Sequence, residues 1–371
     1  FTFALFLVFA LTVNSSAQNN ENLSVMTAKA YSMGGAFTGV ADDVGAVLFN
    51  PAGLTQSGIV GLQGNGGVSD IDTKGLNKAR DFASKVSGDI NYSDADELEN
   101  SFPESTSLSM QAFGGANLKS VALSGKIKST YDIYIDNGEN VFENNNDITG
   151  IISYGAKLAS PPVEVASLAY GFNIKMTQHN YNKYTILSNN NLEKIEAKGN
   201  SIDLDFGVLA KVTDIFKVGA QIDNIYSSGY DLEGKKIISS YNTTTEEWEK
   251  VDENPNWSIN GDRVKRNLRI GASVEVPVVG TTLAADLENI TALSETEGVV
   301  YHLGLQQNLF LNLISVRAGT YGPMNEEENS VEKMYTAGLG INLTKIHLDL
   351  AVGTNENTDN LNGMISGRFK F

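Results

Sequence analysis

Apolar and polar side chains alternate along much of the chain. Over residues 121–135 the odd positions are mostly apolar, while the even positions include Ser, Lys, Thr and Asp. The same alternation recurs over 168–176, 202–212, 268–276, 335–343, 346–352 and 365–371. Successive side chains of a β-strand point to opposite faces, so the pattern predicts strands with one apolar and one polar face.

The alternating segments number fourteen, and the links between them are alternately short and long. Short links fall at 115–118, 160–163, 213–216, 278–281, 309–312 and 344–345, and long polar links fall at 69–104, 136–147, 178–199, 226–264, 290–298, 322–332 and 354–362. Outer-membrane barrels have this asymmetry, with short periplasmic turns and longer extracellular loops. The sequence therefore predicts an all-β fold, an antiparallel transmembrane β-barrel of about fourteen strands. The predicted strands lie near 58–68, 105–114, 119–135, 148–158, 165–177, 200–212, 217–225, 265–277, 282–289, 299–308, 313–321, 333–343, 346–353 and 363–371.

The polar faces of these strands carry full charges as well as hydroxyl groups. A soluble β-sandwich also alternates, but it would need solvent on the polar face of every strand. In a membrane barrel the polar faces line an enclosed lumen, and the apolar faces meet lipid, where closure pairs every backbone group. We therefore expect the following side chains to face the lumen: Asp203, Asp205, Arg269, Glu275, Asp286, Glu288, His302 and Arg317.

The first seventeen residues, FTFALFLVFALTVNSSA, form an uncharged apolar segment that ends in small residues. This pattern is typical of a secretory signal peptide, here with cleavage after Ala17. Its apolar core is well short of the roughly 20 residues that a membrane helix needs. We predict a signal peptide over 1–17 and a mature protein located in the outer membrane of a Gram-negative-type bacterium.

Composition removes several classes of function. The chain of 371 residues has no Cys, which excludes disulfides, thiolate metal sites and a Cys nucleophile. Its 44 acidic and 27 basic residues give a net charge of −17, which disfavours nucleic-acid binding. The three histidines are isolated, so we predict no metal, no cofactor, no catalytic residue and no enzymatic activity. An enzyme would require an ordered acid, His and Ser cluster at the rim, which Asp286, Glu288 and His302 could imitate.

Residues 18–57 precede the first predicted strand and do not alternate. Glycines and small apolar residues permit tight turns there, Asp42 and Asp43 offer one helix N-cap, and Asn50 offers another with Pro51 at the first helical position. A fourteen-strand barrel is wide enough to need filling. We predict that 18–57 forms a plug, or hatch, inside a barrel that spans 58–371.

Within this segment, AYSMGGAFTGVADDVGAVLFNPAGL (30–54) resembles the N-terminal signature of the FadL family of outer-membrane transport proteins for long-chain fatty acids and aromatic hydrocarbons. It is similar at least as closely to the related PorV-like and uncharacterised FadL-like groups. The resemblance implies a fourteen-strand barrel with an N-terminal hatch and a hydrophobic ligand that leaves sideways through the wall. It also implies that these residues belong to the hatch and act as turns, caps and polar anchors: Gly34, Gly35, Ala41, Asp42, Asp43, Asn50, Pro51, Ala52 and Gly53.

The chain ends in GMISGRFKF, with Phe369 and Phe371 on one face of the last predicted strand. This end resembles the C-terminal signal that the insertion machinery of bacterial outer membranes reads. The sequence thus predicts a channel for hydrophobic small molecules, with membrane lipid, an apolar ligand and the insertion machinery as partners. The alternative is a PorV-like adaptor that holds secretion components and transports no small molecule.

Overall fold

The structure is a computed structural model that describes residues 25–72, 106–158, 167–187, 191–242, 244–245, 247–260, 264–290, 298–325, 332–356 and 360–371. The predicted signal peptide and residues 18–24 of the predicted plug lie outside this set, so both stay predictions. No helix among the described residues is long and apolar enough to cross a membrane.

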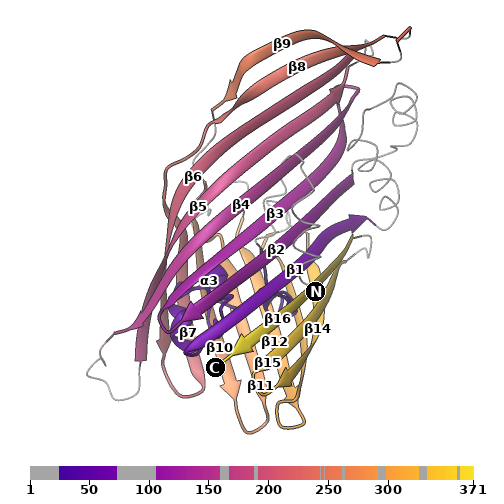
Figure 1. Cartoon of the computed structure of the whole chain (residues 1–371). Coiled ribbons are helices and arrows are strands. Elements are labelled where there is room, and N and C mark those ends of the chain that lie inside the picture. Colours follow the sequence, from indigo (N-terminus) through magenta and orange to yellow (C-terminus); the bar gives the residue numbers. More distant parts are fainter. Residues whose placement is uncertain are drawn as a thin grey trace.

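Sixteen β-strands are found among the described residues, and fourteen of them form a closed antiparallel ring (Figure 1). β7 pairs with β10, and β16 pairs with β1 to close the barrel. The predicted barrel of about fourteen strands is therefore confirmed. The ring strands are β1 (Val60–Asp72), β2 (Thr106–Leu118), β3 (Val121–Asp136), β4 (Glu139–Lys157), β5 (Ser167–Ile186), β6 (Asn191–Lys211), β7 (Phe216–Ser227), β10 (Asn267–Val276), β11 (Thr281–Glu288), β12 (Val300–Leu309), β13 (Ile314–Pro323), β14 (Met334–Leu343), β15 (Ile346–Asn355) and β16 (Asn360–Lys370).

The other two strands, β8 (Leu232–Asn242) and β9 (Glu247–Ile259), form a hairpin outside the ring. β8 pairs with the first part of β6, and β9 pairs with β8. The sequence pattern predicted a long polar loop over 226–264, so the prediction is wrong for this hairpin. Its residues mix Lys, Glu and Asn with apolar and aromatic side chains that do not alternate strictly, so the two-residue pattern does not identify it.

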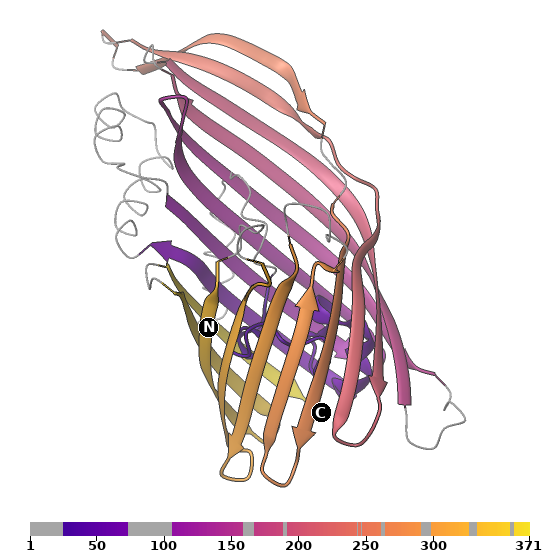
Figure 2. The same cartoon turned by 180° about the vertical axis from the view of Figure 1, so that it is seen from behind.

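The barrel is much taller on one side (Figures 1 and 2). β4, β5 and β6 have 19, 20 and 21 residues, whereas β11 has eight. The loops predicted at 136–147 and 178–199 are therefore mostly strand, and β3 meets β4 at a tight turn. Asn137 and Gly138 occupy this turn with φ values of 52° and 83°, as a two-residue hairpin turn requires. We call the part of β3–β6 above the rest of the ring, together with β8 and β9, the tall wall.

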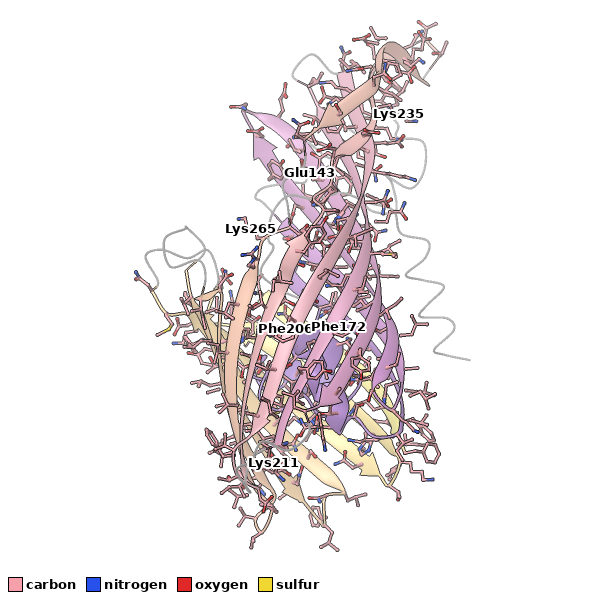
Figure 3. The ribbon with its side chains drawn as sticks, turned by 90° about the vertical axis from the view of Figure 1, so that its left-hand side faces the viewer. Glu143, Phe172, Phe206, Lys211, Lys235 and Lys265 are labelled. Atoms are coloured by element: carbon pink, nitrogen blue, oxygen red, sulfur yellow. The ribbon has the colours of Figure 1, made fainter. Side chains whose placement is uncertain are left out.

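Outward positions of the ring strands expose large apolar side chains, whereas inward positions are mostly polar, with a few buried apolar side chains such as Phe113, Ile151 and Met364. Phe172 and Phe206, for example, are cross-strand partners on the outer side of β5 and β6 (Figure 3). This arrangement is the reverse of a soluble protein and matches a wall that meets lipid. The outward apolar positions around the ring include Leu62, Leu123, Ile152, Ile174, Ile202, Ile270, Leu283, Leu303, Val316, Leu339, Leu350 and Ile365.

The N-terminal segment 25–57 lies inside the short part of the barrel (Figure 2). It contains α2 (Ala28–Tyr31), α3 (Ala46–Phe49) and the 3₁₀ helix η1 (Pro51–Gln56). Asn50 caps η1 by accepting a hydrogen bond from the Ala52 amide, with Pro51 at the first helical position, as predicted. The predicted capping by Asp42 or Asp43 is wrong, because Gly45 precedes α3 and makes no side-chain cap.

Candidate functional site: the plugged lumen

The plug touches the barrel wall backbone to backbone. Its Met33 and Gly34 lie against Gly304 of β12 and Gly319 of β13, and a methyl group at Gly319 would overlap the Gly34 amide. Gly34 itself has a φ of 62°, which an L side chain rarely adopts. Gly155, Gly171 and Gly219 on other ring strands also lie against plug backbone, whereas four more wall glycines make room for plug side chains: Gly207, Gly271, Gly338 and Gly353.

A charged group on β10–β12 binds the part of the plug that follows α2, residues 34–38. The Asp286 carboxylate accepts hydrogen bonds from the backbone amides of Phe37 and Thr38, at 2.9 and 2.8 Å. His302 Nδ1 lies 2.7 Å from the Gly34 carbonyl oxygen, and its Nε2 lies 2.8 Å from Glu288. Arg269 completes this group through a 2.5 Å ion pair with Glu288.

A second charged group joins the plug to β13, β15 and β16. Within the plug, the Lys29 ammonium pairs with Asp42 at 2.6 Å. Arg368 bridges Asp43 of the plug and Asp349 of β15, each at 3.1 Å. Arg317 then pairs with Asp349 at 2.8 Å. The two aspartates that the sequence assigned to a helix cap are therefore partners of cations.

Amide side chains hold the plug on the remaining sides. Asn173 of β5 donates to the Val47 carbonyl at 2.9 Å, and Asn50 donates to the Val208 carbonyl of β6 at 2.8 Å. Asn65 of β1 accepts from the Ala28 amide at 2.9 Å and donates to the Met26 carbonyl at 2.7 Å. Wall residues thus bind plug backbone on several sides, which fixes its position in the lumen.

The other hatch residues implied by the resemblance lie in the same tightly packed segment. Gly35 adjoins His302, and Gly53 packs directly on Ala41. Pro51 and Ala52 lie against the glycines of β4 and β5. Ala41, Pro51 and Ala52 are buried.

Most of the expected lumen-facing residues are buried on the inward side: Asp203, Asp205, Arg269, Asp286, His302 and Arg317. Glu288 is half-buried among them. Glu275 is exposed, 3.8 Å from Lys217, at the end of the barrel where short turns join the strands, which we call the short-turn end. Asp205 pairs with Lys175 at 2.6 Å, a partner that the sequence analysis did not single out. The strict alternation along β5 would have placed Lys175 on the same inward face.

Above the plug, the inner face of the tall wall carries aromatic and apolar side chains. The rings of Tyr181 and Trp257 are nearly parallel, with centroids 6.2 Å apart. The Tyr181 hydroxyl donates to Glu143 at 2.7 Å, and Ile195 and Ala197 are buried on the same side of β6. The sequence analysis missed this surface because it treated the segments as loops.

On the β9 side of the hairpin, a hydrogen bond from Lys250 holds the pKa of Glu253 below its usual value.

An acid, His and Ser cluster does occur on the inner side of β4–β6. His179 Nδ1 lies 2.8 Å from Asp147, and its Nε2 lies 3.2 Å from the Ser201 hydroxyl. That hydroxyl donates to Asp203 at 2.8 Å and is almost fully buried, and the Tyr230 ring stacks on His179. A nucleophile must reach its substrate and pass its proton to the His. The cluster therefore acts as a cross-strand polar network in this state.

A shallow apolar groove of about 610 Å³ lies on the outer wall of β10–β14. Its lining includes Leu283, Leu303, Leu305, Ala318 and Tyr335. Because these side chains point away from the lumen, the groove belongs to the outward surface.

Comparison with known proteins shows which solved structures share this fold. No family model matches the chain, and no curated protein matches its sequence. Similar solved structures include the toluene transporter TodX of Pseudomonas putida, with 12% identity, a TM-score of 0.59 and coverage of 94% of this chain and 99% of that chain. The toluene transporter TbuX of Ralstonia pickettii is 12% identical with a TM-score of 0.57, covering 94% and 99%. A FadL homologue of Pseudomonas aeruginosa is 10% identical with a TM-score of 0.57, covering 97% and 100%. The expected FadL-like barrel is confirmed as a fold.

Proposed function

We propose that the chain is an outer-membrane channel that admits hydrophobic small molecules through a plugged barrel. The observation that carries this proposal is the plug, which is bound by wall side chains inside a ring with an apolar outer face. A plain structural barrel of this width would need no dedicated segment anchored on several sides. Solved barrels of the same fold include toluene transporters, which supports transport of an apolar solute.

The outer membrane is the location that fits this surface. The apolar outward positions form a continuous belt, and the polar inward positions would be costly to expose to acyl chains. The short-turn end would face the periplasm, and the tall wall would stand on the extracellular side. In the same way, Phe369 and Phe371 would serve as the insertion signal at the end of β16.

The inner face of the tall wall offers a first contact for an apolar solute. Tyr181 and Trp257 place two nearly parallel rings on this face, and aromatic rings bind apolar molecules through large contact areas. A solute bound there would lie on the inner side of the tall wall, above the plug and its polar contacts. The hydrogen bond from Tyr181 to Glu143 fixes the orientation of the ring.

Uptake by intact cells tests the proposal. Cells that lack their own fatty-acid channel should accumulate radiolabelled oleate several-fold faster when they make this protein. Trp257→Leu should reduce that uptake, whereas Trp248→Leu should leave it nearly unchanged, because Trp248 packs on Tyr241 and has no described contact with Tyr181. Equal accumulation with and without a correctly inserted protein would overturn transport and leave the adaptor as the working hypothesis.

A further inference from the structure

Two neighbouring turns at the short-turn end of the barrel expose large apolar side chains. In the β10–β11 turn, Val278 is 96% exposed and Val279 is 58% exposed. In the β12–β13 turn, Phe310 is 73% exposed and Leu311 is 102% exposed. We call these four residues the apolar turn pair. A cluster of this kind marks a surface that meets lipid or another protein.

The backbone of the β12–β13 turn is strained. Phe310, Leu311 and Asn312 have φ values of 50°, 56° and 69°. The Leu313 amide donates to the Phe310 carbonyl at 3.1 Å, so Leu311 occupies the first central position of the turn. Asn or Gly normally takes such a position, because bulky side chains are disfavoured at positive φ. The chain keeps an apolar side chain at the tip despite this strain.

Hydrogen bonds hold the two turns together as one surface. Gln307 donates to the Val279 carbonyl at 2.6 Å, and the Asn308 amide donates to the Gly280 carbonyl at 2.8 Å. Asn342 of β14 donates to the Asn312 carbonyl at 2.8 Å. The apolar side chains therefore project from a fixed backbone.

Other described turns at the same end carry charges. Lys119 lies between β2 and β3, Asp214 lies between β6 and β7, and Lys345 lies between β14 and β15. Residues 276–282 and 309–315 contain no charged side chain. The apolar character is thus specific to the turns of β10–β13.

These turns adjoin the shortest strand of the ring. β11 has eight residues. At a rise of about 3.4 Å per residue and a tilt of about 45°, such a strand covers about 19 Å of membrane height, less than the apolar belt of about 25 Å. The apolar turn pair extends the outward apolar surface beyond the strands, in continuity with the exposed Leu309 and Val316.

We infer that the apolar turn pair inserts into the inner leaflet of the membrane and anchors the short side of the barrel at the boundary of headgroups and acyl chains. This inference rests on the proposed membrane location. Lipid fits better than a protein partner because the pair continues the lipid-facing wall and supplies the height that β11 lacks. The strained turn keeps Leu311 at the tip, where it reaches furthest from the strands.

Spin labelling tests the anchor directly, because the chain contains no cysteine. Single variants Leu311→Cys and Val278→Cys would be labelled and reconstituted in vesicles of phosphatidylethanolamine and phosphatidylglycerol. Power saturation then compares collisions with oxygen, which enters hydrocarbon, and with a water-soluble nickel chelate. Leu303→Cys on the outer wall is the control for lipid, and Lys345→Cys is the matched control in a charged turn.

If the anchor is correct, the oxygen-to-nickel collision ratio at positions 311 and 278 should be several-fold higher than at position 345. It should be closer to the ratio at position 303. If 303 shows the ratio of lipid but 311 and 278 match 345, the anchor is wrong and the membrane barrel stands. The collision ratio at position 303 could also match that at 345 in folded protein, whose gel mobility still changes on heating. In that case the membrane location itself is wrong. Either result would overturn the inference, and the two are distinguishable.

Discussion

At the scale of single residues, inward charges of the barrel act mainly on the backbone of the plug. Asp286 receives two plug amides, and His302 lies next to a plug carbonyl. A carboxylate that accepts backbone amides stabilises a fixed segment more strongly than a neutral acceptor does. These side chains therefore determine where the plug sits as well as the charge of the lumen.

Asp286→Ala should lower the free energy of unfolding by about 2 to 4 kcal/mol, because it leaves the buried amides of Phe37 and Thr38 without their charged acceptor. Asp286→Asn keeps one acceptor oxygen and should lose less. Urea unfolding of the detergent-solubilised protein measures both. Glu275→Ala, at the exposed rim, is the control and should change the value by no more than about 0.5 kcal/mol. Equal effects of Asp286→Ala and Glu275→Ala would contradict the anchoring role.

The wall glycines make a separate residue-scale prediction. Gly319→Ala places a methyl group against the Gly34 amide, so it should push the plug off the wall and raise ion leakage. Gly150→Ala is matched, because a methyl group at Gly150 meets nothing within 4 Å. Planar-bilayer conductance should rise for Gly319→Ala and stay at the parent level for Gly150→Ala. An unchanged conductance for both would mean that the lumen is sealed by contacts other than this one.

Residue positions were predictable from the sequence to different degrees. The two-residue period assigned Asp203, Asp286 and Arg317 to the inward face, since parity along a strand determines the face. Their partners were not predictable, because Arg368 and Asp43 are more than 300 residues apart and meet only when the barrel closes. Asp42 and Asp43 looked like caps because local spacing cannot show a distant cation.

At the scale of elements, the sequence located the strands better than their ends. Alternation is strict only where one face meets lipid, so it ends where a strand leaves the apolar belt. The upper parts of β4 and β6 are rich in Asn, Lys and Glu, and for this reason they resembled loops. The Asn137-Gly138 pair was a usable signal, because this dipeptide favours a two-residue hairpin turn between two paired strands.

The tall wall changes what this end of the barrel can bind. A loop would present the aromatic side chains on a mobile backbone, whereas β5 and the added hairpin hold Tyr181 and Trp257 on paired strands. A rigid surface loses less entropy when it binds a solute. The proposed capture surface therefore depends on the strand extension that the sequence analysis did not find.

At the scale of the whole molecule, the plug and the wall constrain the sequence in different ways. The plug packs closely on the wall and on itself, so several of its positions leave no room for a side chain, and a recognisable signature covers 30–54. The wall requires only that apolar and polar positions alternate, which many sequences satisfy. A shared fold with a TM-score of 0.59 at 12% identity follows naturally from this difference.

Closure of the ring between β1 and β16 is the whole-molecule feature on which the lumen depends. Val68 and Gly363 are cross-strand partners there, and Val352 lies opposite Gly363 on the next strand. In the cysteine-free chain, Val68→Cys combined with Gly363→Cys should form a disulfide on mild oxidation, because facing Cα atoms lie about 5 Å apart. Val68→Cys combined with Val352→Cys should not, since two strand spacings are about 9.6 Å. The shift in gel mobility of the unfolded protein reports the bond. Bonding of the second pair in place of the first would mean that β1 meets β15 and that the ring has thirteen strands rather than fourteen.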